Sequence, residues 1–292
     1  MKSNNLITIV TPSYNRGYII RKLYNSLVQQ ERLFEWIIVD DGSTDNTKEI
    51  VNGFIEENIF PIKYIKKSNG GKHTAINMAM KHIQTPLTMI VDSDDFLNSN
   101  AISQIDKYYK KYGERDDIGV FSFLRSDSSG KVILSADNEF IGDYIEYRIN
   151  GNRPGDMAEV FKTDVLRQYP FPEFHDEKFL SEDVVWIEIA KKYKTIFINT
   201  PIYCCEYLPD GLTTHDKPMK FASPLGSMMR GKQLMDRRCG IKANIKGAII
   251  YECFKIETSN KIPEILSLTV KQKILTFILS PLGSYFNKKW KR

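Results

Sequence analysis

The chain has 292 residues, of which 42% are hydrophobic and 26% charged, and its formal net charge is +5. These values are typical of a soluble globular protein with a substantial core. No apolar run reaches the roughly 18 residues that a membrane-spanning helix needs. The N-terminus lacks the apolar core of a signal peptide, and the four cysteines are spaced unlike zinc ligands. We therefore expect a cytoplasmic protein whose cysteines are thiols.

The N-terminal part of the chain alternates short apolar runs with segments of helical periodicity. Strands are predicted at 6–10, 36–39, 62–65 and 87–91, and helices at 17–30, from 43–46 through 54, and from 70–73 through 83. This alternation predicts a parallel sheet with right-handed crossovers.

The rhythm changes after residue 95. Helices are predicted at 101–112 and 182–193, strands at 119–123, 197–199 and 202–203, and further ordered structure at 157–169. From about residue 217 the pattern is helical and basic. We predict an α/β domain over residues 1–216 and a helical C-terminal appendage over 217–292.

Two of the predicted strands end in acidic clusters. Asp40 and Asp41 follow one of them, and Asp92, Asp94 and Asp95 follow another. The carboxyl ends of parallel strands meet at one edge of an open α/β sheet, which is where such sheets bind ligands. The Asp-x-Asp spacing of Asp92 and Asp94 lets two carboxylates face Mg²⁺ or Mn²⁺, with water and phosphate oxygens completing the shell. The pattern predicts nucleotide-phosphate chemistry.

Other segments fit the same chemistry, although each also has a plain structural interpretation. Gly71 and Lys72 open a predicted helix, where free N–H groups and a lysine favour anions. Tyr14 and Arg16 follow the first strand, where they can cover a base and approach a phosphate. Turn formation and helix capping explain these residues without a ligand, and they explain an acidic pair such as Glu182-Asp183 at a helix start equally well.

Four segments together resemble the family 2 glycosyltransferases: Ile9–Arg16, Val39–Asp45, Asn69–Lys72 and Asp92–Asp95. Their order and spacing agree with that family as well as the individual motifs do, and the resemblance covers roughly residues 6–215. It implies a GT-A fold, which is α/β and Rossmann-like with a mostly parallel central sheet, here followed by a helical C-terminal segment. It also implies that a sugar is transferred with inversion from a nucleotide-sugar donor, with a UDP-sugar expected because Asp41 can accept the N3–H of uracil.

The resemblance also implies residue roles. Asp183 is the expected general base and Glu182 its orienting partner. Asp94 is the expected ligand of the divalent metal, and His215 is a second candidate ligand. The expected donor-binding residues are Pro12, Tyr14, Asn15, Arg16, Asp41, Gly71, Lys72, Asp92, Ser93 and Asp156. The chain has Ile76 where the family often has an arginine, so no contact is carried over to that position.

Two other functions stay open. A nucleotidyltransferase would be expected to carry a glycine-rich basic loop directly after the first strand, and residues 12–16 form no such loop. A non-catalytic nucleotide-sugar-binding protein would not need the carboxylates of Asp92, Asp94 and Asp183. No nucleic-acid partner is expected.

The C-terminal tail allows two interpretations. The apolar residues 274–279 are followed by Lys288, Lys289, Trp290, Lys291 and Arg292, which fits peripheral attachment to an anionic membrane surface. A final helix packed on the main domain with a solvated basic tail fits equally well. The first interpretation predicts a place at the inner face of the cell membrane, with a lipid-linked saccharide or polysaccharide acceptor and a role in making cell-envelope polysaccharide.

Overall fold

The structure is a computed structural model that describes residues 5–30, 34–127, 129–132, 139–153, 155–205, 216–258 and 262–291. The chain divides into two compact units, each assembled from several segments. The first unit takes residues 1–143, 154–170 and 192–208, and the second takes 144–153, 171–191 and 209–292. The sequence pattern instead divides the chain once, at residue 216, and that domain boundary stays a prediction.

The first unit is built on one sheet, which among the described residues has nine strands in the order β3-β2-β1-β4-β8-β6-β9-β5, with β7 also paired to β9. The strands are β1 (Ile7–Ser13), β2 (Phe34–Asp40), β3 (Ile62–Lys66), β4 (Leu87–Ile90), β5 (Phe96–Leu97), β6 (Ile118–Asp127), β7 (Phe140–Gly142), β8 (Ala158–Lys162) and β9 (Lys194–Cys205). Strands β1 to β4 are parallel, as the sequence predicts, whereas β8 runs antiparallel to both of its neighbours.

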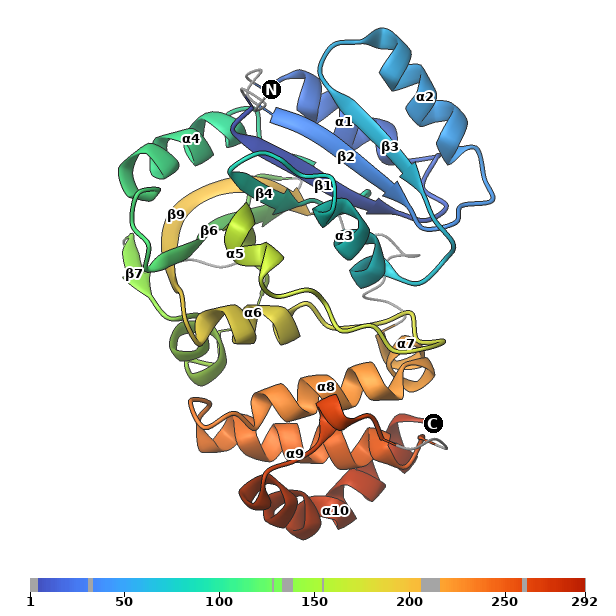
Figure 1. Ribbon diagram of the computed structural model, residues 1–292, viewed down its shortest axis with the longest axis vertical. Coiled ribbons are helices and arrows are strands. Elements are labelled where there is room, and N and C mark those ends of the chain that lie inside the picture. The colour runs from blue at the N-terminus through green and yellow to red at the C-terminus, as the bar shows by residue number, and fades with distance from the viewer. Residues whose placement is uncertain are drawn as a thin grey trace. The chain divides into compact units, whose positions relative to one another are not determined.

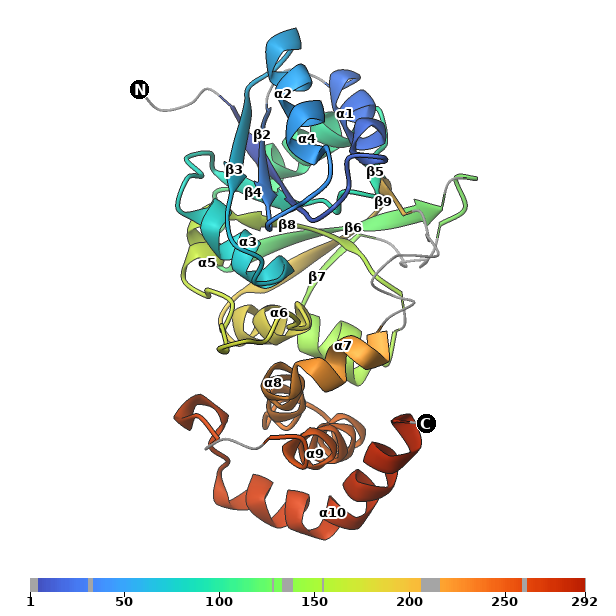
Figure 2. The same cartoon turned by 90° about the vertical axis from the view of Figure 1, so that its right-hand side faces the viewer.

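Helices cover both faces of this sheet (Figure 2). The helices of the first unit are α1 (Ile20–Val28), α2 (Thr47–Glu57), α3 (Lys72–Met80), α4 (Ala101–Tyr112) and α5 (Thr163–Arg167). Helices α1, α2 and α4 pack in one cluster on the face that carries Ile9 and Trp36. Helix α3 packs on the opposite face against Val10 and Val39. Both faces of the central strands are therefore buried, which explains their continuous apolar runs.

Strand β1 is longer than predicted, because it continues through Pro12 to Ser13. Val10 O accepts a hydrogen bond from Val91 N, whereas Ser13 O accepts one from Asp41 N beyond the end of β2. Pro12 falls in the same phase as Val10, so its missing N–H faces the side on which β4 has already ended at Ile90. The proline therefore removes no ladder hydrogen bond.

The two short strands predicted at 197–199 and 202–203 are one strand, β9. Its pairing with β6 shifts register near Pro201, and such irregularities let a proline sit inside a ladder. Strands β5 and β7 were not predicted from the sequence, because segments of two and three residues carry no readable periodicity.

The second unit is helical. It contains the π-helix η1 (Ile145–Asn150), the helices α6 (Asp183–Ala190), α7 (Asp216–Ala222), α8 (Pro224–Leu234), α9 (Ile241–Lys255) and α10 (Val270–Trp290), and the 3-10 helix η2 (Glu264–Leu266). Within this unit α9 packs on both α8 and α10 (Figure 1). A Cβ on Gly247 would lie 2.5 Å from Gly231 O, so the close approach of α8 and α9 requires glycine at this crossing.

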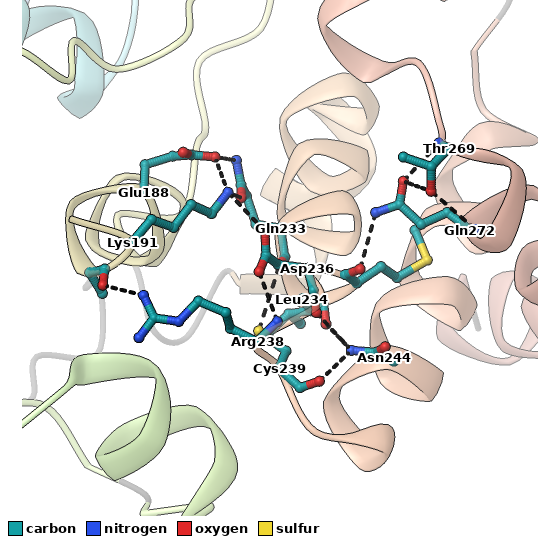
Figure 3. Close-up of polar contacts among 12 residues, drawn as sticks. Glu188, Lys191, Gln233, Leu234, Asp236, Arg238, Cys239, Asn244, Thr269 and Gln272 are labelled. Atoms are coloured by element: carbon teal, nitrogen blue, oxygen red, sulfur yellow. Dashed lines mark hydrogen bonds and ion pairs between the residues drawn. The ribbon is translucent and has the colours of Figure 1, made fainter.

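A polar network joins the helices of the second unit (Figure 3). Lys191 at the end of α6 pairs with Glu188 at 2.7 Å and with Asp236 at 3.1 Å. Gln233 on α8 donates to Glu188 Oε1 at 2.6 Å. At the start of α10, Gln272 donates to Met235 O at 3.1 Å. Helices α6, α8 and α10 are thus held in one unit by side chains as well as by packing.

Candidate active site

Four loops meet at one edge of the sheet in the first unit, because parallel strands end on the same side. The arrows of β1, β2 and β3 point the same way in Figure 1. The chain adds β2 and β3 on one side of β1 and then places β4 on the other side. The loops after β1 and β4 therefore diverge, which creates the crevice that α/β sheets use for ligands. The loops carry nearly all of the predicted donor-binding residues.

Asp41, which follows β2, binds the loop that follows β3. Its carboxylate accepts hydrogen bonds from Gly70 N at 2.9 Å and Gly71 N at 2.6 Å, and it pairs with Lys67 Nζ at 2.7 Å. Gly71 has φ of 92°, a conformation that side chains with a Cβ rarely adopt. Each carboxylate oxygen has two lone pairs, so Oδ2 keeps an acceptor position for a ligand N–H.

Asp40, buried beside Asp41, has a structural role. Its Oδ1 accepts from Ser43 N at 2.6 Å and its Oδ2 accepts from the hydroxyl of Tyr64. Burial and the hydrogen bond to this carboxylate raise the pKa of Tyr64. The two neighbouring acids therefore differ in use, since Asp40 is occupied in the core and Asp41 faces the loop.

The turn after β1 is clamped to the loop after β2. Asn15, which has φ of 53°, donates from its backbone N to Ser43 Oγ at 2.9 Å, and its Oδ1 accepts from Thr44 N at 2.9 Å. Gly17 N donates to Asp45 Oδ2 at 3.0 Å. This clamp fixes the turn while leaving the Tyr14 side chain 48% exposed, as a residue that covers a base must be. Pro12 is half-buried at the start of the same turn.

Asp92 and Asp94 lie in the turn after β4, and cations from two other loops approach them. Lys72 Nζ lies 2.5 Å from Asp92 Oδ1, and Arg16 Nη2 lies 3.9 Å from Asp94 Oδ2. Burial opposes ionisation of Asp92, yet Lys72 holds the pKa of that carboxyl below its ordinary value. Burial raises the pKa of Asp94, and the neighbouring charge of Asp92 raises it further. Ser93 between them is buried.

Tyr203 on β9 holds this turn through two hydrogen bonds. Its hydroxyl donates to Asp95 Oδ2 at 2.7 Å and accepts from Asp92 N at 3.0 Å. The guanidinium of Arg125 stacks 4.3 Å from the Tyr203 ring centroid. Asp95 is thus held by the protein, which leaves Asp92 and Asp94 as the carboxylates available to a ligand.

Arg125 also joins Asp156 to the site electrostatically. Its Nε donates to Met157 O at 2.7 Å, next to the exposed Asp156. Burial opposes the charge on Arg125, but surrounding groups that include Asp156 raise its pKa well above the ordinary value. Asp156 therefore lies within the electrostatic reach of an arginine that also acts on Asp92.

The carboxylates present fit a divalent cation that is shared with a ligand. Among the described residues, no group of three His, Cys, Asp or Glu side chains could hold a metal alone. Mg²⁺ is commonly held by one or two carboxylates and by substrate phosphates, which matches Asp92 and Asp94. Burial and the charge of Asp92 raise the pKa of Asp94, and a bound cation would favour the ionised form of this carboxyl. His215 lies outside the described residues.

Glu182 and Asp183 belong to the second unit, at the start of α6. Asp183 accepts from Arg230 Nε on α8, at 3.2 Å to Oδ1 and 2.9 Å to Oδ2. Its side chain is 14% exposed. Arg230 fixes the direction of the carboxylate, while the second lone pair of each oxygen can still accept a proton.

Several residues of these clusters were not predicted from the sequence. Four of them lie in segments of ordinary composition, and their partners come from other strands, helices or loops: Lys67, Tyr203, Arg125 and Arg230. Ser13 is another, because its Oγ is buried at the end of β1 with no hydrogen-bond partner among the described residues. A sequence signal existed only for Ser13, which lies inside the motif that resembles the glycosyltransferases.

The comparisons with known proteins agree with this arrangement. The model of glycosyl transferase family 2 matches residues 8–163, which is more than half of the chain. The chain belongs to glycosyl transferase family 2. The matched segment contains the loops after β1, β2, β3 and β4, which form the sheet edge described above.

Relatives of this glycosyltransferase are about a third identical to it over the aligned residues. Glycosyltransferase GlyG of Streptococcus pneumoniae is 33% identical over 216 residues, which cover 68% of this chain and 70% of that protein. An uncharacterised glycosyltransferase of Mycoplasma pneumoniae is 32% identical over 114 residues, and the chain spans only 38% of its length. The poly(ribitol-phosphate) β-N-acetylglucosaminyltransferase TarS of Staphylococcus aureus is 32% identical over 98 residues, which are 17% of its length.

Solved structures share the fold of this glycosyltransferase. TarS residues 1–349 in complex with UDP-GlcNAc align with a TM-score of 0.63 at 16% identity, covering 94% of this chain and 79% of that one. The mannosyltransferase PcManGT of Pyrobaculum calidifontis, in complex with GDP-Man and Mn²⁺, aligns with a TM-score of 0.60 at 15% identity, covering 96% and 86%. The GT-A fold expected from the sequence is thereby confirmed, including its helical C-terminal region.

Proposed function

We propose that this family 2 glycosyltransferase is a metal-dependent, inverting enzyme that takes its sugar from a UDP-sugar. The observation that carries the proposal is the turn with Asp92 and Asp94, where Arg16 and Lys72 bring positive charge to a carboxylate pair. Arginine and lysine of this kind bind the phosphates of a nucleotide diphosphate. A divalent cation held by Asp94, beside Asp92, would neutralise the charge that develops on the departing nucleotide diphosphate.

The uridine preference is proposed for Asp41. Asp41 N donates to Ser13 O at 2.8 Å, at the end of β1 where the turn with the exposed Tyr14 begins, which supports a base-binding role. Its spare acceptor position on Oδ2 suits the N3–H of uracil. The structural neighbour TarS was solved with UDP-GlcNAc, which is consistent with a uridine nucleotide. PcManGT was solved with GDP-Man, so the fold alone does not select the base.

Asp183 is proposed as the general base that takes the proton of the acceptor hydroxyl, with Glu182 as its orienting neighbour. The support is chemical: a carboxylate of fixed direction, held by Arg230, can accept a proton on either oxygen. The acceptor is proposed to be a lipid-linked saccharide or polysaccharide of the cell envelope at the inner membrane face. The names of the TarS relatives, which describe a poly(ribitol-phosphate) acceptor, support a cell-envelope acceptor.

A donor panel tests the proposal. The full chain is incubated with Mn²⁺ and with UDP-, GDP- or dTDP-sugars, in the presence of membrane lipid extract, and released nucleotides are measured. We expect UDP release from one UDP-sugar, and inversion at the anomeric carbon of the product by nuclear magnetic resonance. Release of pyrophosphate instead would indicate nucleotidyl transfer, and saturable donor binding without any release would indicate a non-catalytic protein.

The Asp94→Asn variant is the matched test of the metal site in the same panel. The control is Asp106→Asn on α4, which removes a carboxylate of similar exposure that pairs with the surface residue Lys110. Full UDP release by Asp94→Asn would overturn the metal assignment.

A further inference from the structure

The buried residues of helix α10 are small or polar, and most of its large apolar residues are exposed, although Leu275, Leu279, Phe286 and Trp290 are half-buried. Its buried residues are Thr276, Gly283 and Asn287. Its exposed large side chains are Val270, Ile274, Phe277, Ile278, Leu282 and Tyr285, with 80% of Phe277 and 64% of Ile278 exposed. A helix on the surface of a globular protein normally has the reverse arrangement. This face therefore calls for a partner.

The orientation of α10 is fixed along its whole length. At its start Thr269 and Gln272 form a capping box, and Gln272 donates to Met235 O. A Cβ on Gly283 would lie 2.7 Å from the Cβ of Glu252, so the contact with α9 requires glycine there. Near its end Asn287 Nδ2 donates to Cys253 O at 2.8 Å. The apolar residues are held outward because the inward face is bonded and closely packed.

The exposed apolar residues form one continuous face. Each is three or four residues from another of them, and Phe277 and Ile278 are adjacent, which places them side by side along the helix. Pro281 lies within the same stretch and removes one backbone donor, but Ser280 Oγ donates to Phe277 O at 2.9 Å and satisfies the carbonyl left free. The helix continues past the proline and is clearly bent in Figure 2.

Exposed lysines border this apolar face at both ends. They are Lys271, Lys273, Lys288 and Lys289, and the sequence from 270 to 291 contains no acidic residue. Lys291 is already paired with Glu257 at 2.8 Å, and Trp290 packs against Phe254 and Phe286. Lys291 and Trp290, which suggested a membrane contact from the sequence, are therefore engaged within the protein. The exposed apolar face of α10 is the better candidate for that contact.

We propose that the face of α10 formed by Val270, Ile274, Phe277, Ile278, Leu282 and Tyr285 docks the protein on an anionic lipid bilayer, with Lys271, Lys273, Lys288 and Lys289 among the lipid headgroups. An apolar face bordered by lysines is the pattern of helices that lie in the interfacial plane of a membrane. In the part of the chain that the structure describes, no helix is long and apolar enough to cross a bilayer. Contact through one face needs no such helix.

Charge favours the bilayer over a second copy of the chain. Two copies pairing through α10 would bring eight lysines close together. Neither helix has a carboxylate to offset their charge, and like charges repel. Anionic headgroups instead attract each lysine, about fivefold in partition per charge at low salt. This proposal deepens the membrane location that is part of the proposed function, and its test is independent of catalysis because vesicle binding is measured without any reaction.

The test is co-sedimentation of the full chain with vesicles of phosphatidylglycerol and phosphatidylcholine, and with vesicles of phosphatidylcholine alone. We expect binding to the anionic vesicles that weakens as salt is raised, and loss of at least tenfold in partition for Phe277→Ser combined with Ile278→Ser. Replacing Lys288 and Lys289 by glutamine is expected to lower partition by roughly 25-fold, from about fivefold per charge.

Matched controls separate this face from general surface effects. Ile241→Ser removes an apolar side chain that is 69% exposed on α9, and Lys107→Gln with Lys131→Gln removes two exposed lysines of the first unit. Both controls are expected to bind as the natural chain does. Equal binding by all variants, or no binding to anionic vesicles, would overturn the proposal. Light scattering that shows a dimer which Phe277→Ser and Ile278→Ser dissociate, without vesicle binding, would assign the face to a second copy.

Discussion

Asp92 and Asp94 lie in the same turn, yet their surroundings shift the pKa values of the two carboxyls in opposite directions. Lys72 at 2.5 Å lowers the pKa of Asp92, whereas burial and then the charge of Asp92 raise the pKa of Asp94, which the more distant Arg16 and Lys72 offset only in part. Without a bound cation, the ionised form of Asp94 is therefore less favourable in the folded chain than in the unfolded one. Such conflict is expected of a group that serves a ligand rather than the fold.

A consequence for Asp94 can be measured by thermal unfolding. Because its pKa is raised above the ordinary 3.8, the folded chain binds more protons than the unfolded chain in that window, and stability falls as pH rises through it. Asp94→Asn removes this effect, so we expect a higher Tm than the natural chain near pH 7 and no difference well below pH 3.8. Mn²⁺ should raise the Tm of the natural chain only. A lower Tm for the variant at pH 7 would contradict this.

Asp183 is predicted to act on turnover and not on donor binding. Asp183→Asn keeps the shape of the side chain and an oxygen for Arg230 but removes the basicity, so turnover should fall by roughly a hundredfold or more. Donor affinity, measured by calorimetry, should change little. The control is Asp176→Asn, an exposed acid with φ of 64°, a conformation that asparagine also tolerates. A parallel loss of affinity and turnover would place Asp183 in donor binding instead.

At the scale of single elements, the loop after β3 depends on a residue from another strand. Asp41→Ala would leave the N–H groups of Gly70 and Gly71 without their acceptor and would remove the carboxylate beside Lys67, whose ammonium keeps Ser68 O and Thr74 Oγ1. Leaving a backbone donor inside the protein without an acceptor costs about 1–3 kcal/mol. We expect the free energy of unfolding to fall by about that amount, measured by urea denaturation, together with weaker nucleotide binding.

The conservative variants separate the two roles of Asp41. Lys67→Met removes the ion pair but leaves the Asp41 carboxylate for a base, so it should lose stability while keeping a preference for uridine nucleotides. If Lys67→Met and Asp41→Asn lost that preference equally, the selectivity would belong to the loop as a whole and not to the Asp41 carboxylate.

The sequence predicts the elements whose physical signal is local. Strands β1 to β4 and the turns that follow them could be predicted because short apolar runs end in turn-forming residues, which after β2 and β4 are acids. The residues that hold the site carboxylates in place could not be predicted in the same way. Tyr203 contacts Asp95 across 108 residues, and Arg230 contacts Asp183 across 47, so only the folded chain brings each pair together. Periodicity carries no information on such distant pairing.

The whole molecule poses the same difficulty on a larger scale, since compact units need not be continuous in the chain. Residues 171–191 join the C-terminal helices in the second unit, although composition changes only near residue 217. The reason is specific pairing: Glu188 and Lys191 bond to Gln233 and Asp236, and Arg238 Nη1 donates to Ala190 O at 2.7 Å. A boundary drawn from composition separates α6 from these partners.

Truncation after residue 216 tests which description of the chain holds. The shortened chain would lack α8, so Arg230 would no longer pair with Asp183, and the apolar residues of α6 would lose a helix against which they pack within the second unit. We expect the product to aggregate, or to bind hydrophobic dye strongly, while the full chain remains monodisperse in gel filtration. Apolar surface of this kind is costly to expose to water, at about 25 cal/mol per Å². A soluble, monomeric 1–216 fragment that binds UDP would show instead that the last helices are a separable appendage.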